Sequence, residues 1–257
     1  METIQVFPVL TGLTELELQA LDDFKKQPVT NNIPDQYLMV YLFSKKLNVE
    51  KACELLSNNL AFRKKLDLPF PVRKSDVNIE IVKKMYSFFV PNKRDQDGRI
   101  IAYLHPCHLL PKNYTLKEMV ASMLWNSDIT IYENQSMIIR AIAHRNGMVI
   151  VEDLKNVGMK NFDQRLPESL KEMKLAMENV FPGRAQAIYL INQPFFLRFL
   201  LSLAKKFIKS KLVRRVKVIG KKEAMKDVID PSHLLEEYGG TLKFDFPAWV
   251  DSLPADY

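Results

Sequence analysis

The chain lacks the residues and motifs on which several common functions depend. Only two cysteines, Cys53 and Cys107, occur in 257 residues. Two thiols are too few for a disulfide framework, so we expect a reducing, cytoplasmic setting. There is no glycine-rich phosphate loop, no Walker lysine and no Gly-x-Ser-x-Gly elbow. These absences argue against nucleotide-hydrolysing and serine-hydrolase chemistry, and we do not expect an enzyme.

Long apolar runs are also missing. The longest strongly apolar stretch without a charge extends from about Ala185 to Leu197, and Asn192, Gln193 and Pro194 interrupt it. Residues 1–21 carry no basic region followed by a continuous apolar one, which argues against a signal peptide. We therefore expect no bilayer-spanning helix, and any membrane contact should be peripheral and reversible.

One segment has no acidic residue at all. Between Arg198 and Lys222 there are ten Lys or Arg residues and no Asp or Glu, while the rest of the chain has 27 basic and 30 acidic residues. The overall charge of +7 is therefore concentrated in this segment. The same region is rich in Phe and Leu, which favours an anionic membrane as its partner. Nucleic acid is less favoured, since no stacking aromatics are interleaved with the charges.

Two interpretations of this basic segment stay open at the level of periodicity. Arg198, Ser202, Lys205 and Lys209 recur at helical spacing, as they would on an ordinary solvated helix face. The basic run continues into the expected strand 213–219, however, so the charge covers more than one element. The apolar side of the helix expected over 194–209 fits either an ordinary core or a lid over an apolar cavity.

The pattern of elements predicts an α/β fold preceded by a small helical domain. Helical stripes occupy residues 14–68, and Pro69-Phe70-Pro71 marks a boundary. We therefore expect an all-α N-terminal domain over 1–72 and a second domain over 73–257. In the second domain strands alternate with helices, which predicts a largely parallel sheet covered by helices. The expected strands are 99–104, 148–151, 185–191 and 213–219, and the expected helices are 115–145, 167–179 and 194–209.

Two groups of polar residues deserve a chemical interpretation. His105, Cys107 and His108 are close in sequence and carry possible zinc ligands, but no second Cys or His cluster completes a tetrahedral set. His144 with Glu152-Asp153 offers a base and an orienting acid, but nothing places a nucleophile beside them. We expect no metal site, no catalytic residue and no cofactor.

Four short motifs follow one another along the second domain. They are Asp97-Gly98-Arg99, Asn146-Gly147 followed by 148–154, Phe181-Pro182-Gly183-Arg184 followed by 187–194, and Leu234-Leu235-Glu236-Glu237-Tyr238-Gly239-Gly240. Each is weak alone, but together and in this order they resemble the CRAL-TRIO (Sec14-like) lipid-binding family, and the resemblance extends from about residue 12 to residue 245.

The resemblance implies a cavity that encloses one hydrophobic molecule, with the helix over 194–209 as its gate. A closed apolar pocket needs no catalytic group. The residues that we expect to line it are Tyr103, Met123, Trp125, Ile129, Ile150, Met173, Met177, Ile188, Phe195, Phe196, Phe199 and Leu203.

The resemblance also bears on the partners. Phosphatidylinositol carriers of the family typically have Glu where this chain has Gly183, which argues against that passenger. The pattern is closer to the tocopherol-transfer and retinaldehyde-binding branch, which binds phosphoinositide headgroups through residues matching Arg184, Lys211 and Arg215. Gln186 replaces an arginine that is common in that branch, and Leu235 replaces a common proline.

The expected function is therefore a gated lipid-binding and transfer protein that docks on phosphoinositide-containing membranes. Its basic docking face should comprise Arg184, Lys211, Arg214, Arg215 and Lys217. The alternative is a membrane-recruitment or scaffolding module that binds phosphoinositide without moving a ligand.

Overall fold

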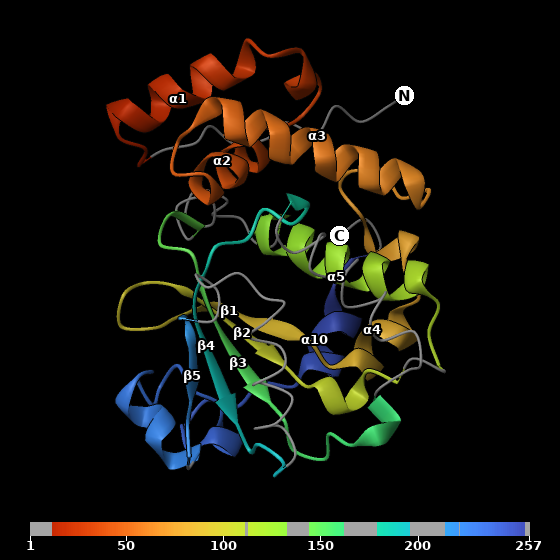
Figure 1. Cartoon of the computed structure of the whole chain (residues 1–257), viewed down its shortest axis with the longest axis vertical. Coiled ribbons are helices and arrows are strands. Elements are labelled where there is room, and N and C mark those ends of the chain that lie inside the picture. The colour runs from red at the N-terminus through yellow and green to blue at the C-terminus, as the bar shows by residue number, and fades with distance from the viewer. Residues whose placement is uncertain are drawn as a thin grey trace.

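The computed structural model defines residues 12–110, 113–132, 144–161, 179–195, 214–220 and 222–254 (Figure 1). Helices near the N-terminus form one layer, and a five-stranded sheet with its covering helices forms the rest of the described molecule. The expected α/β class with a largely parallel sheet is confirmed. The proposed boundary at residue 72 stays a prediction.

The N-terminal layer consists of α1 (Glu15–Lys25), α2 (Asp35–Ser44) and α3 (Val49–Lys65). A capping box begins α1. The Thr14 side chain accepts from the Glu17 N–H, and the Glu17 carboxylate accepts from the Thr14 N–H. The three helices share an apolar core that is separate from the core of the sheet. Residues 36–43 of α2 are all buried, so this helix has no solvated face within the described chain.

The sheet has the order β1-β2-β3-β4-β5. β1 (Phe88–Arg94) and β2 (Ile100–Leu104) form an antiparallel hairpin, and β3 (Met148–Asp153), β4 (Ala185–Ile191) and β5 (Val216–Val218) continue from β2 in parallel. The sequence pattern missed β1, because Pro91 and the polar residues after it interrupt the apolar alternation.

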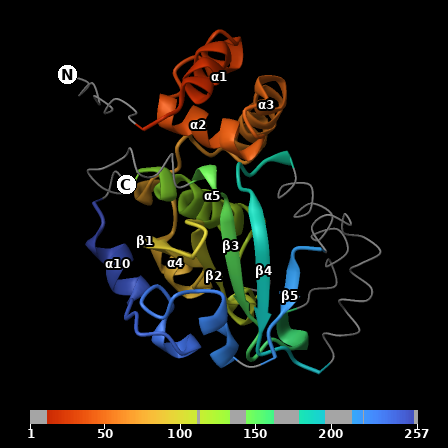
Figure 2. The same ribbon diagram turned by 90° about the vertical axis from the view of Figure 1, so that its left-hand side faces the viewer.

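Three helices cover one face of the sheet. They are α4 (Ile79–Met85), α5 (Leu116–Tyr132) and α10 (Phe246–Ser252) (Figure 2). A capping box begins α5, since the Thr115 N–H and the Glu118 N–H each donate to the other residue's side chain. The helices expected over 167–179 and 194–209 lie almost wholly outside the described residues.

A buried ion pair joins the helical layer to the rest of the chain. Arg63 of α3 donates two hydrogen bonds of 2.9 Å to the Asp128 carboxylate of α5. Asp128 also accepts from the Val72 N–H, and Asn59 accepts from Arg63 and donates to the Val180 carbonyl. This network fixes α3 against α5 in one geometry.

Candidate functional site

The two faces of the sheet differ in how completely they are buried. On the face toward α4, α5 and α10, side chains such as Ile101, Val149 and Val151 are 0% exposed. On the other face Ile150 and Ile188 are also buried, at 7% and 8% exposure, but several of their strand neighbours are only partly buried. They belong to a smaller apolar cluster whose partly buried members include Ala102, Leu104, Met148, Ala185 and Val216. We call this second surface the open apolar face.

The expected cavity residues are divided between these two faces. Ile150 and Ile188 lie on the open apolar face. Tyr103, Trp125 and Ile129 are buried in the core on the helix-covered face, where the Tyr103 ring stacks on Tyr238 at 5.5 Å between centroids. The structure therefore does not bring these five residues to one surface.

Two other expected cavity residues lie outside both apolar cores. Met123 of α5 is half-buried, and Phe195 is 92% exposed, so neither is a core residue. The remaining expected cavity residues, Met173, Met177, Phe196, Phe199 and Leu203, lie outside the described residues.

Two expected docking residues meet at the amino ends of β4 and β5. Arg184 immediately precedes β4, and Arg215 immediately precedes β5 and donates to the Ala185 carbonyl. Burial, and secondarily the Arg215 charge, lowers the pKa of the Arg184 guanidinium. Within the described part of the chain, no carboxylate forms an ion pair with either arginine, and the Arg184 Nε is buried without a hydrogen-bond partner. Among the described residues, this pair is therefore positive charge that no carboxylate neutralises.

The other docking residues extend the charge along the edge of the sheet. Arg214 and Lys217 are exposed, and the Lys217 ammonium lies 5.7 Å from the centre of the Tyr189 ring. Lys211 lies outside the described residues. We call Arg184, Arg214, Arg215 and Lys217 the basic edge.

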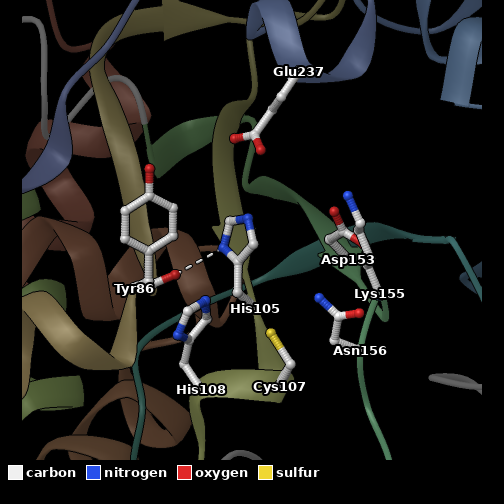
Figure 3. A pocket seen from close by; sticks show the side chains of 8 residues that line it. All are labelled: Tyr86, His105, Cys107, His108, Asp153, Lys155, Asn156 and Glu237. Carbon is white, nitrogen blue, oxygen red and sulfur yellow. Dashed lines mark hydrogen bonds between the residues drawn. The ribbon is translucent and has the colours of Figure 1, made fainter.

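A small polar pocket lies at the opposite, carboxyl end of β2 and β3 (Figure 3). Its volume is about 180 Å³, far too small for a lipid. Residues from the helix, strand and turn segments around His105 converge on it. They are Tyr86, His105, Cys107, His108, Asp153, Lys155, Asn156 and Glu237.

His105 links two other residues near this pocket through its ring nitrogens. Its Nδ1 lies 2.8 Å from the Tyr86 carbonyl oxygen, and its Nε2 lies 2.7 Å from the Tyr238 hydroxyl. Burial lowers the pKa of His105, which favours the neutral ring. In that form Nδ1–H donates to Tyr86, and the Tyr238 hydroxyl donates to Nε2. The imidazole thus fastens the closing Leu234–Gly240 motif to the end of the sheet.

The metal and catalytic alternatives gain no support from this geometry. Within the described ranges, no group of three or more His, Cys, Asp or Glu side chains could hold a metal ion. His144 precedes β3 and Glu152-Asp153 end it, so roughly 20 Å of strand separates the base from its supposed orienting acid. Burial raises the pKa of the Cys107 thiol, which disfavours the nucleophilic thiolate.

Sequence reasoning did not single out Glu152 as a residue of the apolar surface. It is paired in register with Leu104 and Leu190, so it faces the same side as Ile150. The available signal was an acidic residue at an alternate position of a buried strand.

No helix in the described part of the chain is long and apolar enough to cross a membrane.

Comparison with known proteins agrees with this architecture. The model of the CRAL/TRIO domain matches residues 84–240. A CRAL-TRIO domain-containing protein of Dictyostelium discoideum is 44% identical over 253 residues, which is 98% of this chain and 96% of that protein. The human alpha-tocopherol transfer protein-like is 23% identical, with coverage of 91% and 67%. Rat clavesin-1 is 25% identical, with coverage of 85% of this chain and 61% of clavesin-1.

A solved structure shows the same fold. The crystal structure of Sfh5 superposes with a TM-score of 0.60 at 16% identity, and the match covers 94% of this chain and 93% of that one. The sheet order, the ordered motifs and these matches lead to one conclusion: this chain belongs to the CRAL-TRIO family of lipid-binding and lipid-transfer proteins.

Proposed function

We propose that the protein carries one hydrophobic molecule over the open apolar face and docks on phosphoinositide-containing membranes through the basic edge. The observation that carries the proposal is the asymmetry of the sheet. The strand residues of one face are buried in the main core, while several on the other, apolar face are only partly buried, beside arginines that pair with no carboxylate among the described residues. Such an arrangement suits binding and release, and it requires no reacting group.

The energetics of ligand capture support this proposal. Burying ~400 Å² of ligand apolar surface at ~25 cal/mol per Å² yields about 10 kcal/mol before the costs of binding. The gate is proposed to be the helix over 194–209, whose Phe and Leu residues would cover the ligand. Phe195, at the start of this segment, is already the most exposed large apolar side chain in the described chain.

The docking role follows from the chemistry of the basic edge. Arg184 and Arg215 are close enough to perturb each other electrostatically, so an anionic headgroup would relieve their repulsion. Phosphate oxygens also pair well with guanidinium groups, which present several donors in a fixed plane. A phosphoinositide headgroup supplies both features at a membrane surface.

Gly183 bears on the identity of the ligand inside the cavity. Its Cα carries no side chain beside Met148, so the chain offers no carboxylate where phosphatidylinositol carriers of the family have one. We infer that the internal ligand is a small apolar molecule, and that the phosphoinositide headgroup binds outside the cavity.

Membrane docking is tested with a double charge reversal, Arg214→Glu with Lys217→Glu, at two exposed positions. Each basic side chain near an anionic leaflet contributes roughly 1 kcal/mol. Flotation with vesicles containing phosphatidylinositol phosphates should therefore show binding at least ~30-fold weaker. The matched control is Lys64→Glu with Lys65→Glu, on the exposed side of α3, which should bind as the wild type does. Equal binding by both double variants would reject the basic edge as the docking surface.

The scaffolding alternative makes a different prediction. A recruitment module would bind the same vesicles but would not move a fluorescent lipid from donor to acceptor vesicles. Transfer that rises with protein concentration supports the carrier, whereas docking without transfer supports the scaffold.

A further inference from the structure

Three of the four sequence motifs meet at the amino ends of β2, β3 and β4. The Asn146 side-chain amide donates to the Asp97 carbonyl at 3.0 Å, and the Met148 N–H donates to the Arg184 carbonyl at 3.0 Å. The amino ends of β3 and β4 are the ends nearest the N-terminal helices (Figure 2). The turns that precede the three strands therefore form one connected unit, and Arg184 of the basic edge belongs to it.

The side chain of Arg184 rests on the turn over 145–147. Its Nη2 donates to the Arg145 carbonyl at 2.6 Å. Gly147 has a φ of +80°, and a Cβ there would lie 2.5 Å from the Arg184 carbonyl oxygen and 3.4 Å from the Arg184 Nε. A side chain at residue 147 would therefore displace Arg184. The orientation of the Arg184 guanidinium is thus set by the backbone of this turn.

Arg145 of this turn is anchored to α1. Its Nε and Nη2 each donate a hydrogen bond of 2.6 Å to a different carboxylate oxygen of Glu17, and Nη2 also donates to the Gly12 carbonyl at 3.1 Å. The guanidinium lies 5.7 Å from the centre of the Phe43 ring in α2. Two parallel charge-assisted hydrogen bonds fix both the distance and the plane of a guanidinium. Glu17 therefore determines where Arg145, and with it the support of Arg184, lies.

The burial of this ion pair distinguishes it from the Lys25–Asp35 pair between α1 and α2. The side chains of Lys25 and Asp35 are 48% and 41% exposed, and such a pair contributes little to stability. The Glu17 side chain is only 7% exposed. Burial alone would raise the pKa of Glu17, but hydrogen bonds from Thr14 and Arg145 outweigh it and lower this pKa, which keeps the carboxylate charged. A buried ion pair of this kind is better explained by the geometry that it fixes than by net stability.

We propose that Glu17 and Arg145 are positioning residues of the membrane-docking surface, which hold Arg184 in the orientation that receives the phosphate groups of a phosphoinositide headgroup. This inference rests on the proposed docking function and extends the residues responsible for it to α1. Neither positioning residue needs to touch the lipid. Because coupling between two sites is reciprocal, a headgroup bound to Arg184 should also hold α1 more firmly in its place.

The most decisive test is Glu17→Gln, because charge and positioning predict opposite results for it. A glutamine at this position can still accept from the Thr14 N–H and complete the capping box, but it cannot form the ion pair with Arg145. The variant has one negative charge fewer, so charge alone predicts tighter binding to vesicles that contain phosphatidylinositol bisphosphate. The positioning role predicts binding about fivefold weaker in a flotation assay.

Two further variants complete the series. Glu15→Gln removes the same charge at an exposed position in the first turn of α1, and should bind at least as tightly as the wild type. Arg145→Lys keeps its charge but cannot form two parallel hydrogen bonds, and should lose about as much affinity as Glu17→Gln. Binding by Glu17→Gln that equals or exceeds that of the wild type would overturn this inference and leave the docking surface intact. Wild-type protein that does not bind these vesicles would overturn both.

Hydrogen exchange of the wild-type protein gives a second test, which does not depend on the folding of any variant. A water-soluble, short-chain phosphatidylinositol bisphosphate at saturating concentration should slow the exchange of the α1 amides about fivefold, because headgroup binding opposes the local opening of α1. The amides of α4 serve as the internal reference and should keep their rate. Equal exchange of α1 with and without the bound probe would contradict the proposed positioning role.

Discussion

At the scale of single residues, two polar groups stabilise the fold through partners that lie far away in the sequence. His105 contacts Tyr86 and Tyr238, which are 19 and 133 residues away. Arg63 and Asp128 form an ion pair across 65 residues. Residue type determines which interactions are available, and the tertiary fold determines the partner.

Breaking the Arg63–Asp128 pair should be strongly destabilising. Both side chains are nearly inaccessible, at 3% and 5% exposure, so Asp128→Asn leaves a buried guanidinium without its counter-charge. We expect a loss of about 3–5 kcal/mol in the free energy of unfolding, measured by urea denaturation. The double variant Arg63→Met with Asp128→Leu should recover most of that loss. A single variant as stable as the wild type would refute the role of the pair.

His105 should make stability depend on pH. Because burial lowers its folded-state pKa, the unfolded chain binds the proton more readily. Its stabilising contribution is therefore complete above the unfolded pKa, roughly 6.5, and is lost as the pH falls through the folded pKa. His105→Phe should flatten the decline in unfolding free energy below neutral pH, and should cost about 1–3 kcal/mol at pH 7 through the unpaired Tyr238 hydroxyl and Tyr86 carbonyl. An equally steep decline in His105→Phe would contradict this account; His233→Gln is the control.

At the scale of elements, hydrophobic periodicity predicted the helices and strands well wherever neighbouring residues alone carry the pattern. The strands β2, β3 and β4 and the beginning of α5 near residue 115 were predicted from the sequence and are confirmed. β1 and α10 were missed because a proline interrupts the one and the other is only seven residues long. The cavity residues stay a prediction, because a list of apolar residues does not distinguish the two faces of a sheet until the register is known.

The closing motif over Leu234–Gly240 illustrates an element that depends on close backbone packing. A Cβ at Gly240 would lie 1.8 Å from the Leu234 carbonyl oxygen. The backbone would have to shift, and with it the Gly240 N–H bond to Leu235 and the Leu242 N–H bond to Leu234. Gly240→Ala should destabilise the protein by about 2–4 kcal/mol in urea unfolding.

Gly220→Ala is the matched control, because nothing lies within 4 Å of a Cβ at that position. It should change stability by less than about 0.5 kcal/mol. Similar effects of the two substitutions would show that the closing motif is not constrained in this way.

At the scale of the whole molecule, the basic edge is linked to the N-terminal helices by a chain of contacts. Arg184 donates to the Arg145 carbonyl at 2.6 Å, and the Arg145 guanidinium binds both carboxylate oxygens of Glu17 in α1. This arrangement holds α1 close to the proposed docking surface. The sequence shows where basic residues are concentrated, and the fold shows that Arg184 and Arg215 lie near each other.

The central claim is that the protein is a carrier occupied by a single apolar molecule, and native mass spectrometry of the purified protein tests it most directly. The account predicts a complex heavier than the chain by the mass of one lipid, at one molecule per chain, which organic extraction removes and incubation with vesicles restores. Protein that is consistently empty and stays empty after incubation with a panel of lipids would contradict it.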